Sequence, residues 1–146
     1  MRKEIWFDMD GTIADFYSVS GWLNSLMNED TTPYEVARPL INMNSLARIL
    51  NRLIKNGYTV NIVSWGSKGA TAEFCERIAT AKIEWLHRHL SSVEFNRIEV
   101  VPYGTYKEVV ANYTDGILFD DEEPNRRYWS GKAYDVNDIL GVLKTL

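Results

Sequence analysis

Short apolar runs alternate with longer amphipathic segments along this chain. Between the runs, apolar residues recur at helical spacing over residues 46–54 and again over residues 75–90. The runs themselves are bounded by polar or turn residues and are typical of strands buried on both faces: residues 5–7, 58–63, 98–101 and 116–119. Strands that alternate with helices predict an α/β fold, a three-layer, doubly wound parallel sheet.

Weaker signals complete this outline. A short fifth strand is expected near residues 132–134, Gly57 fits the end of the first long helix, and Asp135 fits the start of a last helix. Residues 16–40 form a longer connection than a simple crossover needs, with one short amphipathic helix expected around Trp22. We therefore expect a single domain over residues 1–146, with a small helical insertion at about 16–40.

Composition narrows the classes of function. The length of 146 residues suits one domain, and 16 basic against 20 acidic residues give a net charge of −4. This balance argues against binding to duplex nucleic acid or to an anionic membrane. A single cysteine, Cys75, cannot form an internal disulfide, and the apolar stretch near the N-terminus is too short for a signal peptide or a membrane span. A cytoplasmic protein is therefore expected.

Residues able to bind phosphate or a metal follow each of the four apolar runs. Ligands of open parallel sheets bind beyond the carboxyl ends of the strands, so these side chains should converge on one site. They are Asp8, Asp10, Ser64, Lys107, Asp120 and Asp121.

The first two carboxylates are spaced so that both can act on the same ligand. Asp8 and Asp10 are two residues apart, which in an extended segment points both side chains to the same side of the chain. Gly11 follows, where the absence of a side chain permits a sharp turn and a close approach to a ligand. The alternative is an ordinary Asp-Gly turn after a strand.

The second acidic cluster, residues 120–125, would be a solvated turn in isolation. Its first two carboxylates, however, should lie beside those of the first strand, and two unit charges about 4 Å apart repel by about 4 kcal/mol at an effective dielectric near 20. A divalent cation resolves this repulsion, and an all-oxygen ligand set favours Mg²⁺ over Zn²⁺. His87 and His89 should diverge on a helix and offer no competing site.

Lys107 is the candidate phosphate ligand of the third strand. Thr105 and Glu108 have the spacing of a capping box, which predicts Thr105 as the N-cap and places Lys107 in the first helical turn. A cation there opposes the helix dipole, and a bound phosphoryl group would compensate it. The alternatives are a flexible surface lysine, or Lys68 as the phosphate contact instead.

Together these residues resemble the four motifs of the haloacid dehalogenase-like (HAD) phosphohydrolase superfamily. The resemblance rests on the strand that ends in residues 7–12 (FDMDGT), on Ser64, on Lys107, and on Asp120 and Asp121 with Asn125, in the expected order along the chain. The longer string over residues 8–16 is similar to the opening of the 5′(3′)-deoxyribonucleotidases. The resemblance implies a Rossmann-like HAD core with a minimal helical cap.

The resemblance also implies a mechanism. Asp8 would attack the phosphorus and form an aspartyl-phosphate, while Asp10 would protonate the leaving oxygen and then activate water. Ser64 and Lys107 would hold the phosphoryl oxygens.

The same resemblance implies how the metal is held. Mg²⁺ would be bound by Asp8, the backbone carbonyl of Asp10 and Asp121, with Asp120 nearby. Gly11, Thr12 and Asn125 would support the site.

The implied substrate is a small phosphomonoester, with a nucleoside monophosphate as the first to test. A minimal cap leaves an open mouth, which would admit bulky substrates or be covered by a partner subunit. Aromatic residues near the mouth could stack a nucleobase or could simply pack the insertion: Phe16, Tyr17, Trp22 and Trp65. Arg126 and Arg127 could contact a second phosphate or face solvent.

Three alternatives remain open at this point. A polynucleotide 3′-phosphatase would use the same open site. A signalling receiver domain also combines an acidic cluster, a Ser or Thr, a Lys and Mg²⁺, but would carry its phosphoacceptor on a middle strand of the chain, whereas here the Asp-x-Asp-Gly-Thr run follows the first. A catalytically dead domain would be expected to lack some of the candidate residues, all of which are present.

Overall fold

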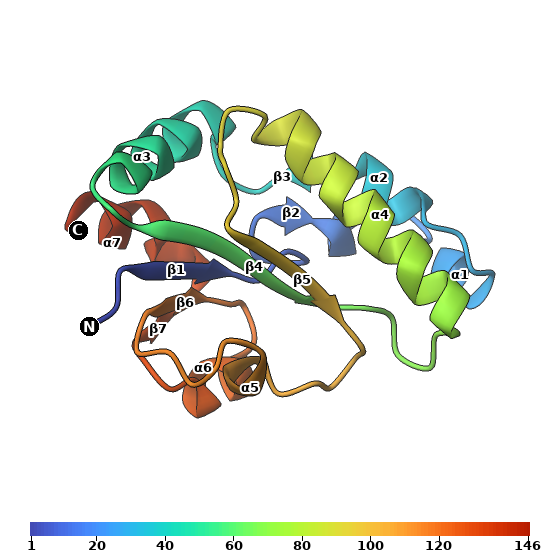
Figure 1. Cartoon of the computed structure of the whole chain (residues 1–146). Coiled ribbons are helices and arrows are strands. Elements are labelled where there is room, and N and C mark those ends of the chain that lie inside the picture. The colour runs from blue at the N-terminus through green and yellow to red at the C-terminus, as the bar shows by residue number, and fades with distance from the viewer.

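The structure is a computed structural model that describes residues 1–146. At its centre lies a five-stranded, wholly parallel sheet in the order β5-β4-β1-β6-β7. Helices cover both faces of this sheet (Figure 1), which confirms the predicted doubly wound α/β fold. The strands are β1 (Glu4–Phe7), β4 (Thr59–Trp65), β5 (Arg97–Val101), β6 (Ile117–Phe119) and β7 (Ala133–Tyr134).

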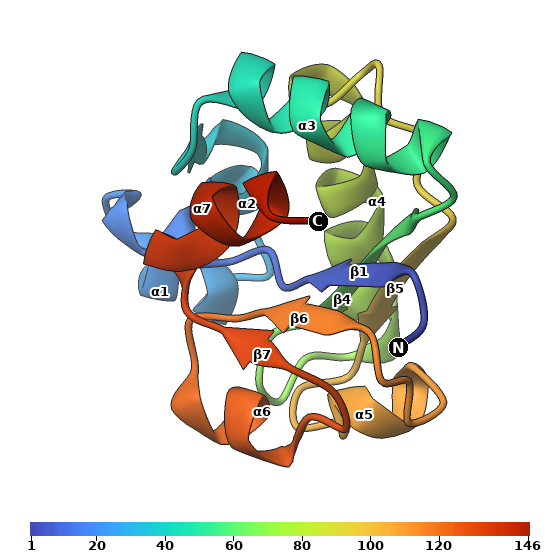
Figure 2. The same cartoon turned by 90° about the vertical axis from the view of Figure 1, so that its left-hand side faces the viewer.

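The two faces of the sheet carry cores of different size. On one face lie α3 (Met43–Lys55), α4 (Ala72–His89) and α7 (Ile139–Lys144), and on the other lie α5 (Lys107–Val110) and α6 (Glu123–Tyr128), as Figure 2 shows. Because side chains alternate along a strand, Ile5 and Phe7 of β1 join the larger core, whereas Trp6 joins the smaller one. The smaller core is completed by Val63, Ala111, Leu118 and Trp129.

Local capping explains where the main helices begin and end. The Asn42 side chain accepts a hydrogen bond from the Ser45 amide at the start of α3, and Thr71 accepts one from the Phe74 amide at the start of α4. Gly57 has a φ of +95° just after α3, as its predicted position required. Asp135 caps the 3₁₀ turn Val136–Asp138, which continues into α7.

The segment after the first motif begins and ends in a small antiparallel pair of strands. β2 (Ala14–Asp15) pairs with β3 (Arg38–Pro39), and between them lie the 3₁₀ turn Phe16–Ser18, α1 (Trp22–Met27) and α2 (Thr32–Val36). Its aromatic residues pack against the side of α4 in one buried cluster: Phe16 and Tyr34 with Phe74, Ile78 and Ala81. The segment therefore stands beside the carboxyl ends of the strands.

Two sequence predictions about local structure are wrong. All the residues of β5 are half-buried, because β5 is an edge strand and is not covered on both faces. Thr105 does not cap α5: its hydroxyl donates to the Pro102 carbonyl at 2.6 Å, and the helix starts after Tyr106 with Lys107 as its first residue.

No helix of the protein combines the length and the apolar character needed to cross a membrane.

Candidate active site

The two acidic motifs meet because their strands are neighbours. β1 pairs with β6 so that Phe7 lies opposite Phe119, and the Asp8 amide donates to the Phe119 carbonyl at 2.9 Å. From β1 the chain builds the sheet outward through β4 and β5, and it then returns to add β6 and β7 on the other side. Asp8 and Asp120 thus flank the point where strand order reverses, which is the usual ligand site of such sheets.

Lys107 joins the two acidic motifs. Its ammonium is buried and donates to Asp8 Oδ1 at 2.9 Å and to Asp120 Oδ2 at 2.7 Å. The same nitrogen lies 5.2 Å from the centre of the Trp65 ring. Lys68 lines the same cleft but forms no ion pair, so of these two candidate phosphate ligands Lys107 is the one that contacts the acidic residues.

Thr12 links the first motif to Asp121. The Thr12 hydroxyl donates to Asp8 Oδ2 at 2.9 Å and accepts a hydrogen bond from the Asp121 amide at 3.2 Å. Gly11 precedes it with a φ of +78°, a left-handed conformation that glycine adopts without strain. This tight turn brings the backbone of the first motif against the acidic loop.

Asp120 is held entirely by the protein. Its carboxylate is fully buried, and it accepts hydrogen bonds from Lys107, from the Glu122 amide at 2.9 Å and from the Asn125 side chain at 3.2 Å. Arg126 also donates to the Asp120 carbonyl, at 3.0 Å.

The two arginines of α6, for which the sequence leaves both a second-phosphate contact and a solvent-facing position open, have protein partners outside the cleft. Arg126 is tied to the Asp120 carbonyl, Arg127 pairs with Glu123 at the surface, and neither lines the cleft.

The acidic residues are close enough to require a counter-charge. One carboxylate oxygen from each of Asp8, Asp120 and Asp121 lies within 4.8 Å of the others. Burial and repulsion from Asp8 raise the pKa of Asp120 to about 6 and that of Asp121 to about 8. Burial also acts to raise the pKa of Asp8, but the Lys107 ammonium outweighs it and holds that pKa below its usual value.

These oxygens fit a hard divalent cation such as Mg²⁺. Asp8 and Asp121 line the cleft and can both offer an oxygen to it. Asp120 does not line the cleft, and its two oxygens already accept protein hydrogen bonds. Asp121 is therefore the better direct ligand, and Asp120 the better second neighbour.

Asp10 and Ser64 line the cleft too, and both accept a hydrogen bond from a lysine that the sequence motifs do not include. Lys82 of α4 is buried, and its ammonium donates to Asp10 Oδ2 at 3.0 Å and to Ser64 Oγ at 2.7 Å. Burial raises the pKa of Asp10, although the Lys82 charge opposes the change. A signal was available: Lys82 falls on the apolar stripe of its helix, four residues from both Ile78 and Leu86.

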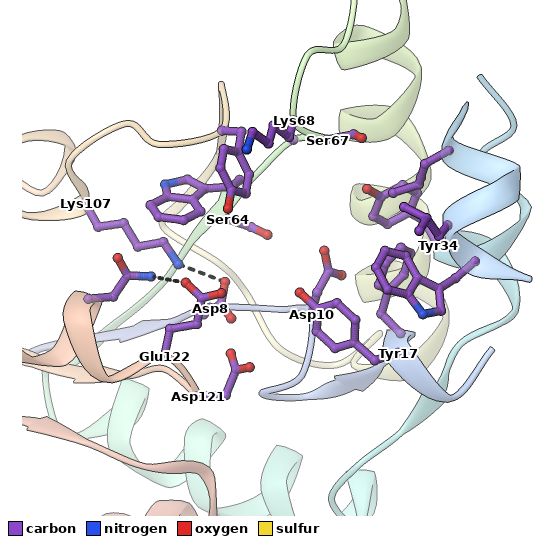
Figure 3. Close-up of a pocket in the computed structure, with 18 of the residues that line it drawn as sticks. Asp8, Asp10, Tyr17, Tyr34, Ser64, Ser67, Lys68, Lys107, Asp121 and Glu122 are labelled. Carbon is purple, nitrogen blue, oxygen red and sulfur yellow. Dashed lines mark hydrogen bonds and ion pairs between the residues drawn. The ribbon is translucent and has the colours of Figure 1, made fainter. Parts of the chain in front are cut away.

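An aromatic wall stands across the cleft from the carboxylates. The cleft has a volume of about 350 Å³, with Lys107 on one side and Tyr17 and Tyr34 on the other (Figure 3). Phe16 is buried and stacks on Tyr34 with ring centres 4.5 Å apart, while Trp22 meets the half-exposed Tyr17 edge to face. Apolar residues of α1 extend the wall toward the mouth: Leu23, Leu26 and Met27.

Comparison with known proteins supports the fold independently. No protein-family model matches the chain, and no curated protein sequence is similar enough to count as a relative. Among solved structures, the D,D-heptose 1,7-bisphosphate phosphatase from Burkholderia thailandensis has a TM-score of 0.54 at 16% identity, over 89% of this chain and 75% of that one.

A second structural neighbour has the same fold. The D,D-heptose 1,7-bisphosphate phosphatase from B. bronchiseptica, complexed with magnesium and phosphate, has a TM-score of 0.55 at 15% identity, over 91% of this chain and 78% of that one. Both likenesses confirm the fold expected from the sequence, because they extend over most of each chain.

Proposed function

We propose that this protein is a HAD-like, Mg²⁺-dependent phosphatase that hydrolyses small phosphomonoesters through an aspartyl-phosphate on Asp8. The observation that carries the proposal is the arrangement of Asp8, Asp121 and Lys107 around one cleft. Asp8 offers an ionised carboxylate, Asp8 and Asp121 are potential metal ligands, and Lys107 is a buried cation. Phosphoryl transfer needs all of these groups. The fold shared with phosphatases, one of them bound to magnesium and phosphate, supports it.

Asp8 is suited to be the nucleophile. Lys107 keeps its carboxylate ionised, and Thr12 and Lys107 fix its two oxygens from opposite ends. In the first step an Asp8 oxygen bonds to phosphorus as the bond from phosphorus to the leaving oxygen breaks. Asp8, Asp121 and the Asp10 carbonyl would hold Mg²⁺, which would neutralise charge on the phosphoryl oxygens.

Asp10 is suited to move the proton. In the first step the Asp10 carboxyl donates a proton to the leaving oxygen. In the second step its carboxylate takes a proton from a water molecule, whose oxygen attacks phosphorus as the bond to Asp8 breaks and inorganic phosphate is released. Lys107 makes two hydrogen bonds to protein carboxylates, so its third N–H is available for a phosphoryl oxygen. The Ser64 hydroxyl lines the same space and can donate to another.

The aromatic wall favours a nucleoside monophosphate over a sugar phosphate. A sugar presents hydroxyl groups that need polar partners, whereas the residues of the insertion that line the cleft are all aromatic or apolar. Within this wall, Tyr17 and Trp22 are the rings with surface to offer a base, because Phe16 is already buried against Tyr34.

The strand order argues against a receiver domain. In receiver domains the strands of the sheet, numbered along the chain, have the flavodoxin-like order 2-1-3-4-5. Here the five strands of the sheet, numbered along the chain, run 3-2-1-4-5. Asp8 therefore follows the first strand at the centre of the sheet.

The proposal is tested by assaying the purified protein with p-nitrophenyl phosphate, nucleoside monophosphates and sugar phosphates. We expect Mg²⁺-dependent turnover that chelation abolishes, at least about 10⁴-fold lower activity in Asp8→Asn, and about 10² to 10⁴-fold lower activity in Asp10→Asn. Trp22→Ala should raise KM for nucleotides and leave KM for sugar phosphates unchanged. Stable, stoichiometric phosphorylation without turnover would contradict the phosphatase assignment, and preference for sugar phosphates would contradict the nucleotide assignment.

A further inference from the structure

Lys82 uses its whole hydrogen-bonding capacity on the protein. Besides Asp10 Oδ2 and Ser64 Oγ, its ammonium donates to the Trp65 carbonyl at 2.7 Å. A lysine ammonium has three N–H donors, so none remains for a ligand. Its side chain is 1% exposed, and removing such a charge from water costs several kcal/mol unless its partners compensate.

The two buried lysines of the site differ in this respect. Lys107 donates to two carboxylates and keeps one N–H for the cleft, whereas Lys82 donates to three fixed oxygens and does not line the cleft. Lys107 is therefore placed to touch the substrate. Lys82 is placed to hold the groups that do.

The oxygens that Lys82 holds come from separate parts of the chain. Asp10 lies in the loop after β1, and Ser64 and Trp65 lie at the carboxyl end of β4. The Tyr34 ring of the insertion covers the same ammonium, with its centre 5.0 Å from the nitrogen. The Lys82 side chain thus contacts three parts of the site at once: the loop that carries Asp10, the end of β4 that carries Ser64, and Tyr34 of the aromatic wall.

We infer that Lys82 is a positioning residue, which fixes the Asp10 carboxyl for proton transfer to the leaving group. This inference rests on the proposed phosphatase function.

The test compares leaving groups in Lys82→Met. A nucleoside monophosphate releases a strongly basic alkoxide that needs a proton, whereas p-nitrophenyl phosphate releases a phenolate that needs far less help. We expect kcat/KM for the nucleotide to fall about 10²-fold and that for p-nitrophenyl phosphate to fall roughly tenfold less. The inhibition constant of inorganic phosphate should stay within about threefold, because Lys82 does not touch the phosphoryl group.

A double variant isolates the route of the effect. If Lys82 acts through Asp10, then Asp10→Asn with Lys82→Met should retain the nucleotide activity of Asp10→Asn alone, within about threefold. Lys82→Gln, which keeps donors at this position, should lose less activity than Lys82→Met and guards against a folding defect. Lys55→Met, at an exposed position of α3, is the control that should match the wild type.

Several results would overturn the inference. Equal losses for both leaving groups, weaker inhibition by phosphate, or additive losses in the double variant would assign Lys82 a structural or phosphate-binding role instead. If the wild type is active and Lys82→Met is equally active, the positioning role of Lys82 is refuted but the proposed function is not. A wild type without any Mg²⁺-dependent phosphatase activity would remove the proposed function, and the role of Lys82 with it.

Discussion

Gly11 leaves just enough room for the carboxylate of Asp121. A Cβ on residue 11 would lie 2.5 Å from Asp121 Oδ2 and 2.9 Å from its carboxyl carbon, so no larger residue fits without displacing the acid. The φ of +78° adds a second restriction at the same position. The glycine of the first motif therefore determines where a potential metal ligand of the last motif stands.

Gly11→Ala should accordingly impair Mg²⁺ binding as well as stability. The left-handed backbone alone costs about 1–2 kcal/mol with a Cβ, and the shift of Asp121 comes in addition. Gly104→Ala is the matched control, because Gly104 has a φ of +86° and a Cβ there would meet no atom within 4 Å. Titration of activity against Mg²⁺ should show a raised half-saturating concentration for Gly11→Ala alone. Equal metal dependence in both variants would refute the steric argument.

Replacing each lysine in turn should distinguish the role of Lys107 from that of Lys68. Lys107→Met removes the cation between Asp8 and Asp120, leaving two buried carboxylates without their counter-charge. We expect about 10³-fold or greater loss of kcat and a destabilisation of about 3–5 kcal/mol, measured by denaturant unfolding. Lys68→Met should retain the stability of the wild type and change kcat less than about threefold, because Lys68 forms no ion pair. Comparable losses of kcat in both variants would show that Lys68 shares the phosphate-binding role.

The raised carboxyl pKa values predict a pH-dependent stability for the metal-free protein. Asp120 and Asp121 titrate near pKa values of about 6 and about 8 when folded but near 3.8 in an ordinary environment, so the folded chain keeps protons that the unfolded chain has released. Without Mg²⁺, Tm should therefore fall as pH rises from about 4 to 8. Added Mg²⁺ should raise Tm more at pH 8 than at pH 5, because it binds the ionised carboxylates.

The control for this pH dependence is a pair of neutralised acids. Asp121→Asn should flatten both the pH profile and the response to Mg²⁺, whereas Glu94→Gln, at an exposed loop position, should change neither. A metal-free protein whose Tm rises between pH 5 and 8 would contradict the assigned environment of the acidic residues.

The strand ends were the most informative part of the sequence. Buried parallel strands produce continuous apolar runs, and the residues that interrupt them face one common edge, so Asp8, Ser64 and Asp120 could be placed together from the sequence alone. The pairing of β1 with β6 then brings the two acidic motifs together, although more than a hundred residues separate Thr12 from Asp121 along the chain.

Helix-borne contributors were harder to predict. The apolar stripe of α4 predicts a core face, but a lysine within that stripe does not show which buried oxygens its ammonium meets, as Lys82 does. The sequence predicts only one short helix in the insertion, and α2, with five residues and a proline at its start, gives no sign that Tyr34 packs over Lys82. The supposed cap at Thr105 failed for a local reason, since the turn after Pro102 claims its hydroxyl.

The β2–β3 pair has an evolutionary consequence. Asp15 and Arg38 lie opposite each other at the two ends of the insertion, so the chain leaves the loop after β1 and returns to it at nearly the same point. The segment between those ends is joined to the rest of the chain at one place, and Tyr34 within it packs over the Lys82 ammonium that holds Asp10 and Ser64. Under the proposed function, exchange of this segment would change the surface offered to the leaving group, provided that the contact of Tyr34 with Lys82 is kept.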